Sequence, residues 1–553
     1  MNKRKTFFIL VALALVLALG LTACGQKATP TPAPAKPAAT EAPAATAAPA
    51  ATEAPAAAET AAPTEAPAPA NNKTIVIGTT DKVTDLDPAN AYDFHTWEIF
   101  HNTMDTLLHY KPGTTDLEPA LATSYDVSKD GKEYTFHLRK GLKFDDGTPF
   151  NAEAVKWSID RVVKIQGDPN WLVTSFVDHV EVVDDYTVKF VLKKAVNYFP
   201  LLVATYPYAP ISPKCYPADK IASDSTCGGI GPYKIAKWAR DQEMDLVANP
   251  NWYGAPPKAS NIIIKYFADA TTMRLALENG EIDIALKSLN PTDYADLKQN
   301  PNLQVIEGPG AYIRYIVFNV KMKPFDDPKV RQAIAYAVDR QAIVDKVYQG
   351  THEPLYTMVP IGMWSHKDTF PKRDLAKAKQ LLQEAGYSAD NPLKIDLWWT
   401  PTHYGDTESD MASVVKEALE ETGMIKVNLQ SAEWATYTDQ FGSMGMFLLG
   451  WYPDYMDPDD YTYPFAASDA SDDIGSNYSS PEMDALFAKE QAATDLRGAD
   501  REKVFYEIQQ LWAQDVPTIP LSQGKLLVVA QKNITGIVLD PVMANHYFLF
   551  DKK

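Results

Sequence analysis

The alternation of apolar and polar positions predicts several short β-strands along the chain. Residues 134–138 and 187–192 alternate between the two kinds of side chain, as expected of half-buried strands. Residues 74–78 and 262–266 are short runs rich in isoleucine, and β-branched residues favour extended backbone. These four segments are therefore predicted strands.

Other segments carry the signals of helices. Asp327 is a good N-cap and Pro328 suits the first turn, so a helix is expected to begin there and to run to about Tyr348, before Gly350. Because predicted helices and strands are intermixed along the chain, we expect an α/β fold. Further helices are expected over 374–385, from Ser480 onward, over 501–513, and around the apolar positions of 411–419.

Residues 1–23 have the pattern of a secretory signal peptide. A positively charged start is followed by an apolar stretch at 7–20, which is shorter than the roughly 20 residues of a spanning helix. The run LTAC at 21–24 resembles a bacterial lipobox, which implies cleavage before Cys24 and a diacylglycerol on its thiol. Stable anchoring needs more than one acyl chain. The alternative is an ordinary signal peptide with a chance cysteine.

Residues 24–72 are expected to form a tether rather than a domain. From residue 28 the segment is rich in Ala, Pro, Thr and Glu and has no aromatic residue, so it cannot bury enough apolar surface to offset the entropy of folding. Its prolines favour polyproline II, at about 3.1 Å per residue. The segment is either a stalk that lifts the body off the membrane or a tolerated insertion.

The remaining residues, 73–553, have the composition of a globular body. This length is too great for one hydrophobic core, so two or three domains are expected. The formal net charge of −19 and a pI near 5.0 argue against nucleic acid as a partner, because phosphate binding needs basic patches. Acidic pairs such as Asp459 and Asp460 are expected in solvated loops.

Three cysteines are present, and two remain if Cys24 is acylated. An oxidising compartment favours a disulfide between Cys215 and Cys227, and the alternative is two buried free thiols. No Cys or His pair nearby has the spacing of metal ligands, so we expect neither a metal nor a cofactor.

A series of short motifs follows in order along the body. Together they resemble the solute-binding protein family 5 of ABC transporters, which includes dipeptide- and oligopeptide-binding proteins, and the resemblance covers 73–553. The motifs are EPALA (118–122), SKDGK (128–132), FHLRKG (136–141), FDDG (144–147), FNAE (150–153), GIGPY (229–233), ENGEID (278–283), FN (318–319), DPKVRQAI (327–334), AKAKQLL (376–382) and EAGY (384–387).

The resemblance implies a two-lobed, periplasmic-binding-protein-like α/β fold of type II, in its large three-domain variant. A ligand would sit between the lobes, which close by a hinge motion. The implied boundaries are domain I at 73–110, 213–269 and 526–553, domain II at 111–212, and domain III at 270–525.

The loop at 450–458 resembles the segment in peptide-binding members where a buried carboxylate pairs with the α-ammonium of the ligand. By position this carboxylate is Asp454. A charged ammonium in a closed cleft needs an opposite charge, because its desolvation otherwise prevents binding. Backbone groups from Gly450 to Tyr452 can pair with an extended peptide as an added strand. Without the resemblance, such a run would be interpreted as a solvated turn.

Aromatic residues complete the implied site. Trp451 and Trp434 correspond to aromatics that line side-chain pockets, although buried tryptophans are commonly ordinary core. Tyr455 belongs to the same loop. Tyr312 follows a predicted lobe crossing at 309–310 and is a candidate for the cleft, with Arg314 and Tyr315 beside it; the alternative is a tyrosine-rich strand with one snorkelling arginine.

One position departs from the dipeptide-specific members. They carry, near the end of the segment that resembles 397–404, an arginine that holds the carboxylate of the ligand. Tyr404 occupies that place here, with His403 beside it as a possible carboxylate partner. The departure favours longer peptides, or ligands that lack a carboxylate.

The sequence does not predict an enzyme. The SxxK run at 413–416 lies on a helix with its apolar stripe elsewhere, and the GxG at 229–231 is followed at once by Pro232. We therefore expect a monomeric receptor on the extracytoplasmic face of the membrane, held by its lipid, that delivers short peptides to a permease and ATPase complex. The alternatives are a receptor for an oligosaccharide or another amine-bearing solute, and a sensory or chaperone-like adaptor.

Overall fold

The structure is a computed structural model that describes residues 73–553, apart from 288, 402, 406 and 543. The predicted signal peptide, the tether and Cys24 lie outside the described residues. Within the described part, no helix has both the length and the apolar character needed to cross a bilayer.

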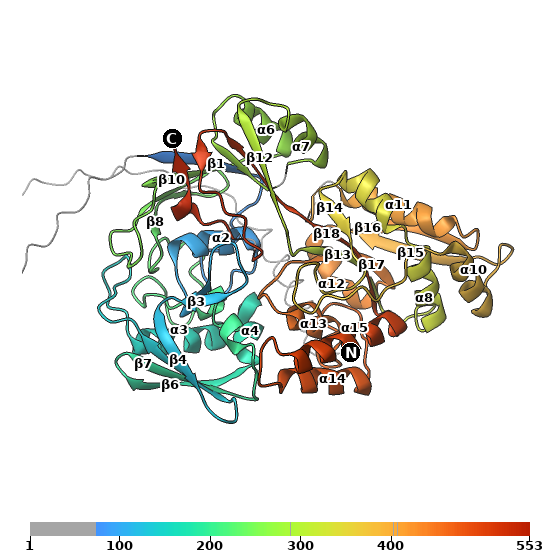
Figure 1. The fold of residues 1–553 in the computed structure, drawn as a ribbon, viewed down its shortest axis with the longest axis horizontal. Coiled ribbons are helices and arrows are strands. Elements are labelled where there is room, and N and C mark those ends of the chain that lie inside the picture. The colour runs from blue at the N-terminus through green and yellow to red at the C-terminus, as the bar shows by residue number, and fades with distance from the viewer. Residues whose placement is uncertain (1–72, 288, 402, 406, 543) are drawn as a thin grey trace, which may run out of the picture. The chain divides into compact units, whose positions relative to one another are not determined.

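A seven-stranded sheet contains the first predicted strand, β1, at its centre (Figure 1). Ile75 and Ile77 of β1 are fully buried, because the strand pairs in parallel with β10 on one side and with β11 on the other. The strands, in spatial order, are β12 (Leu303–Gly308), β19 (Leu526–Gln531), β11 (Ile284–Leu286), β1 (Thr74–Thr79), β10 (Asn261–Tyr266), β9 (Glu243–Ala248) and β8 (Tyr233–Ala239).

Two strands of this sheet come from the segment that we expected in domain III. β11 pairs with β1 and β19, and β12 pairs with β19. The chain therefore leaves this sheet after Gly308, later than the predicted boundary at residue 270. The expectation failed because the partner of a strand is set by long-range pairing, which the pattern of one segment does not reveal.

A four-stranded antiparallel sheet is covered by the helix α3 (Ala152–Ile165). The side chain of Asn151 caps α3 by accepting a hydrogen bond from the backbone N–H of Ala154 at 3.0 Å. Phe136 and Phe190 are fully buried and in edge-to-face contact. The strands are β4 (Ala122–Val127), β5 (Glu133–Leu138), β7 (Thr187–Leu192) and β6 (Val177–Asp184).

A six-stranded sheet lies apart from the other two in Figure 1. Its central strand, β13, is buried along its whole length. We call this sheet and its helices the second lobe, and the other two sheets the first lobe. The strands are β14 (His352–Pro354), β18 (Thr518–Gly524), β13 (Ile313–Phe318), β17 (Met446–Trp451), β15 (Leu393–Trp399) and β16 (Ile425–Ser431), and the helices are α8 (Pro328–Ala337), α10 (Leu375–Glu384), α11 (Glu408–Glu420), α14 (Pro481–Gln491) and α15 (Ala499–Asp515).

The helix predicted from Pro328 to Tyr348 is interrupted. α8 ends at Ala337 because Val338 takes extended ψ, and the side chain of Asp339 then caps a new helix, α9 (Arg340–Ile343). The other elements are α2 (Phe94–Thr103), β2 (Leu108–Tyr110), β3 (Leu117–Pro119), η1 (Asp168–Asn170), α4 (Trp171–Thr174), α5 (Phe199–Leu202), η2 (Tyr206–Tyr208), α6 (Ala270–Glu278), α7 (Pro291–Leu297), η3 (Val344–Tyr348), α12 (Trp434–Asp439), η4 (Phe441–Ser443), η5 (Pro458–Tyr461), α13 (Tyr463–Ala466), β20 (Ile534–Thr535), η6 (Tyr547–Leu549) and β21 (Asp551–Lys552).

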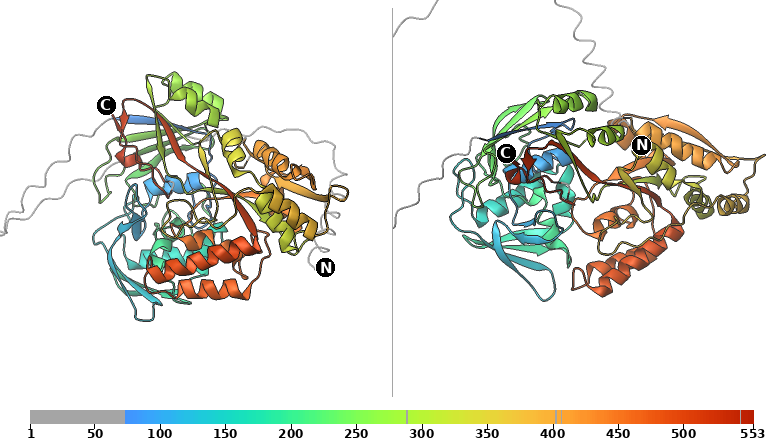
Figure 2. Two further views of the ribbon diagram at one scale, coloured as in Figure 1. Left: turned by 45° about the vertical axis from the view of Figure 1, so that its right-hand side comes forward. Right: turned by 45° about the horizontal axis from the view of Figure 1, so that its top comes forward.

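Two antiparallel segments cross from one lobe to the other (Figure 2). Their pairing extends to Gly308 opposite Leu526 in the seven-stranded sheet and resumes at Ile313 opposite Gln523 in the six-stranded sheet. Gly524 is needed in this crossing, because a Cβ there would lie 1.7 Å from the ring of Tyr312.

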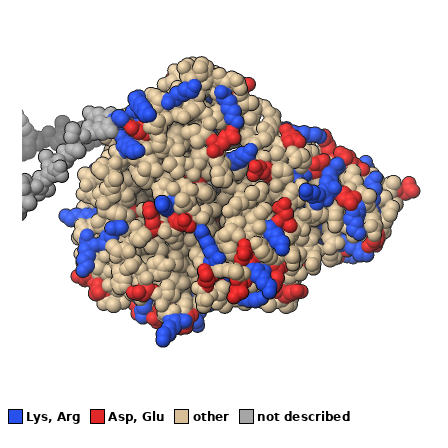
Figure 3. Space-filling view, in the orientation of Figure 1, with Lys and Arg blue, Asp and Glu red and all other residues tan. Residues whose placement is uncertain are grey.

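The structure contains the disulfide between Cys215 and Cys227, which are 12 residues apart. On the face drawn in Figure 3, basic and acidic side chains are interspersed.

Candidate ligand-binding site

Asp454 lies in the loop after β17, where it meets the first lobe. Its Oδ2 accepts a hydrogen bond from the hydroxyl of Tyr92 at 2.8 Å, and Tyr92 precedes α2. None of the ion pairs among the described residues involves Asp454. Burial without a cation raises the pKa of the Asp454 carboxyl to about 7, and the hydrogen bond from Tyr92 opposes this shift.

A second carboxyl, that of Asp460, is directly beside it. The Oδ2 of Asp460 accepts hydrogen bonds from the backbone N–H of Asp454 and from Nε1 of Trp451, each at 3.2 Å. Its Oδ1 is buried with no hydrogen-bond partner among the described residues. Burial, together with the charge of Asp454, raises the pKa of Asp460 well above its ordinary value. The expectation that Asp459 and Asp460 lie in a solvated loop was wrong, because both are at most 1% exposed.

The same loop contains an acid that is neutralised. The guanidinium of Arg501, on α15, donates two hydrogen bonds of 2.7 Å to the two carboxylate oxygens of Asp457. Its Nε also donates to Glu490 at 2.9 Å. This buried network fixes the loop to α14 and α15, so the Asp454–Asp460 pair is presented on a rigid support.

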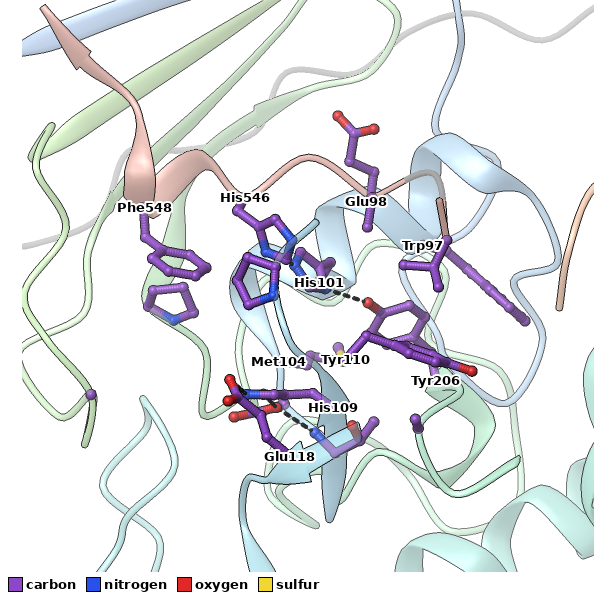
Figure 4. A pocket seen from close by; sticks show the side chains of 18 of the residues that line it. Trp97, Glu98, His101, Met104, His109, Tyr110, Glu118, Tyr206, His546 and Phe548 are labelled. Carbon is purple, nitrogen blue, oxygen red and sulfur yellow. Dashed lines mark hydrogen bonds and ion pairs between the residues drawn. The ribbon is translucent and has the colours of Figure 1, made fainter. Parts of the chain in front are cut away.

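A cavity of about 350 Å³ opens beside Asp454. Trp97 and His101 of α2, Tyr206 and Phe548 are among the residues that line it (Figure 4). The wall is mostly aromatic and apolar, and the volume falls within the range of small-molecule sites. The cavity can therefore hold an apolar group attached to a cation at Asp454.

The polar groups at the back of the cavity are already bonded to one another. His101 contacts the hydroxyl of Tyr206 at 3.0 Å and Nδ1 of His546 at 2.7 Å, and Nε2 of His546 lies 2.7 Å from Oδ2 of Asp540. Burial lowers the pKa of His101 well below its usual range, so this imidazole is neutral at pH 7.

A third histidine on the cavity wall is charged. His109 lies 3.0 Å from Asp105 and 3.2 Å from Glu118. Burial lowers its pKa, but the two carboxylates outweigh burial and raise it to about 9. Among the described residues, no group of three or more His, Cys, Asp or Glu side chains has the arrangement of a metal site.

An aromatic cluster lies on the second lobe, next to the crossing. Tyr452 stacks on Tyr312 with ring centres 5.3 Å apart, and Phe94 of the first lobe lies 4.5 Å from the ring of Tyr452. Trp434 stacks on His403 at 3.6 Å. The aromatic side chains that were predicted from the sequence thus lie near the C-terminal end of β17 and the residues that follow it.

Tyr404 and Gly450 meet at this end of the strand. The hydroxyl of Tyr404 donates a hydrogen bond to the carbonyl of Gly450 at 3.2 Å, and the guanidinium of Arg314 lies over the Tyr404 ring at 3.8 Å. A Cβ on Gly450 would lie 2.2 Å from Nη1 of Arg314, so a side chain there would displace the guanidinium.

The residues that the sequence suggested as ligand-binding do not form one pocket. They are Tyr312, His403, Tyr404, Trp434, Gly450, Trp451, Tyr452, Asp454 and Tyr455. Asp454 alone among them lines the 350 Å³ cavity. Trp451 packs against Phe465 with ring centres 5.0 Å apart. Tyr455 is 2% exposed, stacks on Tyr198 of the first lobe at 5.5 Å, and donates to Asp459. Tyr455 therefore holds the loop in place and does not reach the cavity.

The chain folds into two lobes, with paired carboxyls beside an aromatic cavity where Asp454 meets the first lobe, and this is the architecture expected of a solute receptor. Residues 116–473 match the family described as bacterial extracellular solute-binding proteins, family 5. The chain belongs to this family, as the resemblance of its motifs predicted.

Known proteins agree with this assignment. The chain is 30% identical to the dipeptide-binding protein of Escherichia coli over 80% of this chain and 87% of that one. It is also 30% identical to heme-binding protein A of Haemophilus influenzae, over 85% and 91% of the two chains.

Solved structures show the same fold. The dipeptide-binding protein of Pseudoalteromonas in complex with Met-Leu has a TM-score of 0.77 and 26% identity, over 87% of this chain and 100% of that one. The periplasmic binding protein DppA of Helicobacter pylori in complex with the peptide STSA has a TM-score of 0.75 and 27% identity, over 87% and 98%.

Proposed function

We propose that this protein is the extracytoplasmic receptor of an ABC importer and that it binds short peptides by their free amino end. The observation that carries the proposal is the Asp454–Asp460 pair, two buried carboxyls without a cation beside an aromatic cavity. The relatives named as dipeptide-binding proteins, and the neighbours solved with peptides, support peptides as the ligand class.

An ammonium group fits this pair chemically. It carries three N–H donors, and the pair offers carboxylate oxygens together with the hydroxyl of Tyr92. A buried charge is costly unless it is paired, so the pair disfavours an anionic or neutral group and favours a cation. The first side chain of the peptide would enter the cavity lined by Trp97, Tyr206 and Phe548.

The alternatives satisfy the site less well. An oligosaccharide could stack on the aromatic residues, but its hydroxyls would leave both carboxyls without a cation. Haem is the ligand named for one relative, but both ring nitrogens of His101 in the cavity already have partners, so this imidazole is not free to ligate an iron. Another amine-bearing solute would meet the same carboxyls, so it is separated from a peptide only by experiment.

A thermal-shift screen tests the proposal. The protein is unfolded and refolded to remove bound solute, and is then titrated with di- to octapeptides, their N-acetylated forms and oligosaccharides. Free peptides should raise the melting temperature and acetylated ones should not. Asp454→Asn should abolish the difference, and Asp472→Asn, at an exposed loop position, should retain it. Stabilisation by sugars alone would reject peptides as the ligand.

Attachment to the membrane is part of the same proposal. Acylation of Cys24 would hold the receptor at the outer face, where the tether lets it reach a permease. Cys24→Ser should move the protein from the membrane fraction to the soluble fraction of cells. An unchanged membrane fraction would point to an uncleaved signal segment instead.

A further inference from the structure

Arg314, on β13, has a buried guanidinium with only part of its hydrogen bonds made. Its side chain is 4% exposed, and Nη2 pairs with Oε1 of Glu408. Nη1 has no acceptor among the described residues, and Oε2 of Glu408 has no donor there. A buried charged donor without a partner is costly. An anion that paired with Nη1 of Arg314 would remove this cost.

Arg314 lies beside the strand end that leads into the Asp454 loop. Arg314 and Gly450 are directly opposite each other on neighbouring strands, so the guanidinium lies over the backbone of Gly450. Tyr404, which stands where dipeptide-specific members carry an arginine, stacks on this guanidinium at 3.8 Å. A cation is therefore present next to position 404, although it comes from a different strand.

Another buried arginine, Arg501, shows how a guanidinium with its charge fully paired is bonded in this protein. Arg501 holds two carboxylates, those of Asp457 and Glu490, within 2.7 to 2.9 Å. Arg314 holds only that of Glu408. The guanidinium can bind two carboxylates at once, so the pair with Glu408 does not exclude a second one at Nη1.

We propose that Arg314 binds the carboxylate end of the ligand through Nη1 and replaces, from β13, the arginine that position 404 lacks. The inference rests on the proposed peptide function and adds to it that the ligand has a free carboxylate. It differs from our expectation from the sequence, in which Tyr404 favours longer peptides or ligands that lack a carboxylate.

The test uses the full chain and degenerate peptide libraries of two to eight residues, each made as free acids and as C-terminal amides. Peptides captured by the refolded protein are identified by mass spectrometry, and affinities are measured by calorimetry for the best acid, its amide and its N-acetylated form. Arg314→Gln is combined with Glu408→Gln, so that no buried charge is left unpaired.

The wild-type protein should bind the acid at least about tenfold more tightly than the amide, as expected for a charge-assisted hydrogen bond. The double variant should bring this ratio near one and keep the penalty for N-acetylation, which also shows that it is folded. Equal affinity of the wild type for acid and amide overturns the proposal without any variant. A ratio that survives in the double variant overturns the proposal, because it assigns the carboxylate to another cation. If N-acetylation has no effect either, the proposed function itself has failed.

Discussion

The binding of a free-amine peptide should depend steeply on pH, because the Asp454 carboxyl has a pKa of about 7 in the ligand-free protein. An ammonium beside it favours the ionised form, so binding lowers this pKa and releases a proton. At pH 5 only about 1% of the carboxyl is ionised, against about half at pH 7. The affinity should therefore fall about 50-fold between pH 7 and pH 5. It should also fall above about pH 8, where the peptide amine itself loses its proton.

Calorimetry between pH 5 and pH 8.5 measures this dependence, and comparison of buffers with different ionisation enthalpies counts the proton released. Asp454→Asn should remove the slope below pH 7 while lowering the affinity at pH 7.5. Asp472→Asn is a control at an exposed position and should keep the slope. A flat affinity between pH 5 and pH 7 in the wild type would refute the reasoning, since it would mean that no carboxyl near the amine titrates in this range.

Other perturbations give separate tests of the structure. Because the pKa of Asp454 is raised in the folded protein, its neutral form stabilises the ligand-free protein at low pH, and this contribution is lost as pH rises through 7. The melting temperature of the wild type relative to Asp454→Asn should therefore fall between pH 5 and pH 8. Gly450→Ala would place a methyl 2.2 Å from a guanidinium, so the free energy of unfolding should fall by about 1–3 kcal/mol and peptide affinity with it; unchanged denaturant midpoints would contradict this contact. Arg501→Met leaves two buried acids unpaired and should cost about 3–5 kcal/mol in urea unfolding, whereas Arg497→Met, whose partners are exposed, should cost less than about 1 kcal/mol. Cys215→Ser opens a loop of 12 residues and should lower stability by about 3 kcal/mol, a loss that reduction of the wild type should reproduce.

The strands and most helices were predictable because their signals are local. Residues 134–138 alternate, and the structure has the strand Glu133–Leu138 there. The break after Ala337 was missed, because Asp339 has a cap role only once the chain turns at Val338. The sheet membership of Ile284–Leu286 was not predictable, since its partners come from the two ends of the body.

Only the part of the site that lies in a family motif could be predicted from the sequence. Asp454 was named from the resemblance of its loop, but the same loop gave no sign that Asp460 is buried against it. His101 and His546 are 445 residues apart, and no pattern in either segment indicates their contact. Arg314 had an ordinary interpretation as a snorkelling residue, which the structure contradicts because the side chain is buried.

The double crossing between the lobes has a mechanical consequence. The two antiparallel segments are tied together at the crossing, where Gln523 donates to the carbonyl of Gly310 at 2.7 Å and the N–H of Gly524 donates to the carbonyl of Tyr312 at 3.0 Å. A pair of strands that are bonded to each other can bend across its plane, whereas sliding of one strand past the other would break these bonds. The soft coordinate of the lobes is therefore an angle. A membrane partner that responds to this angle would detect that a solute is held, whatever its side chains are.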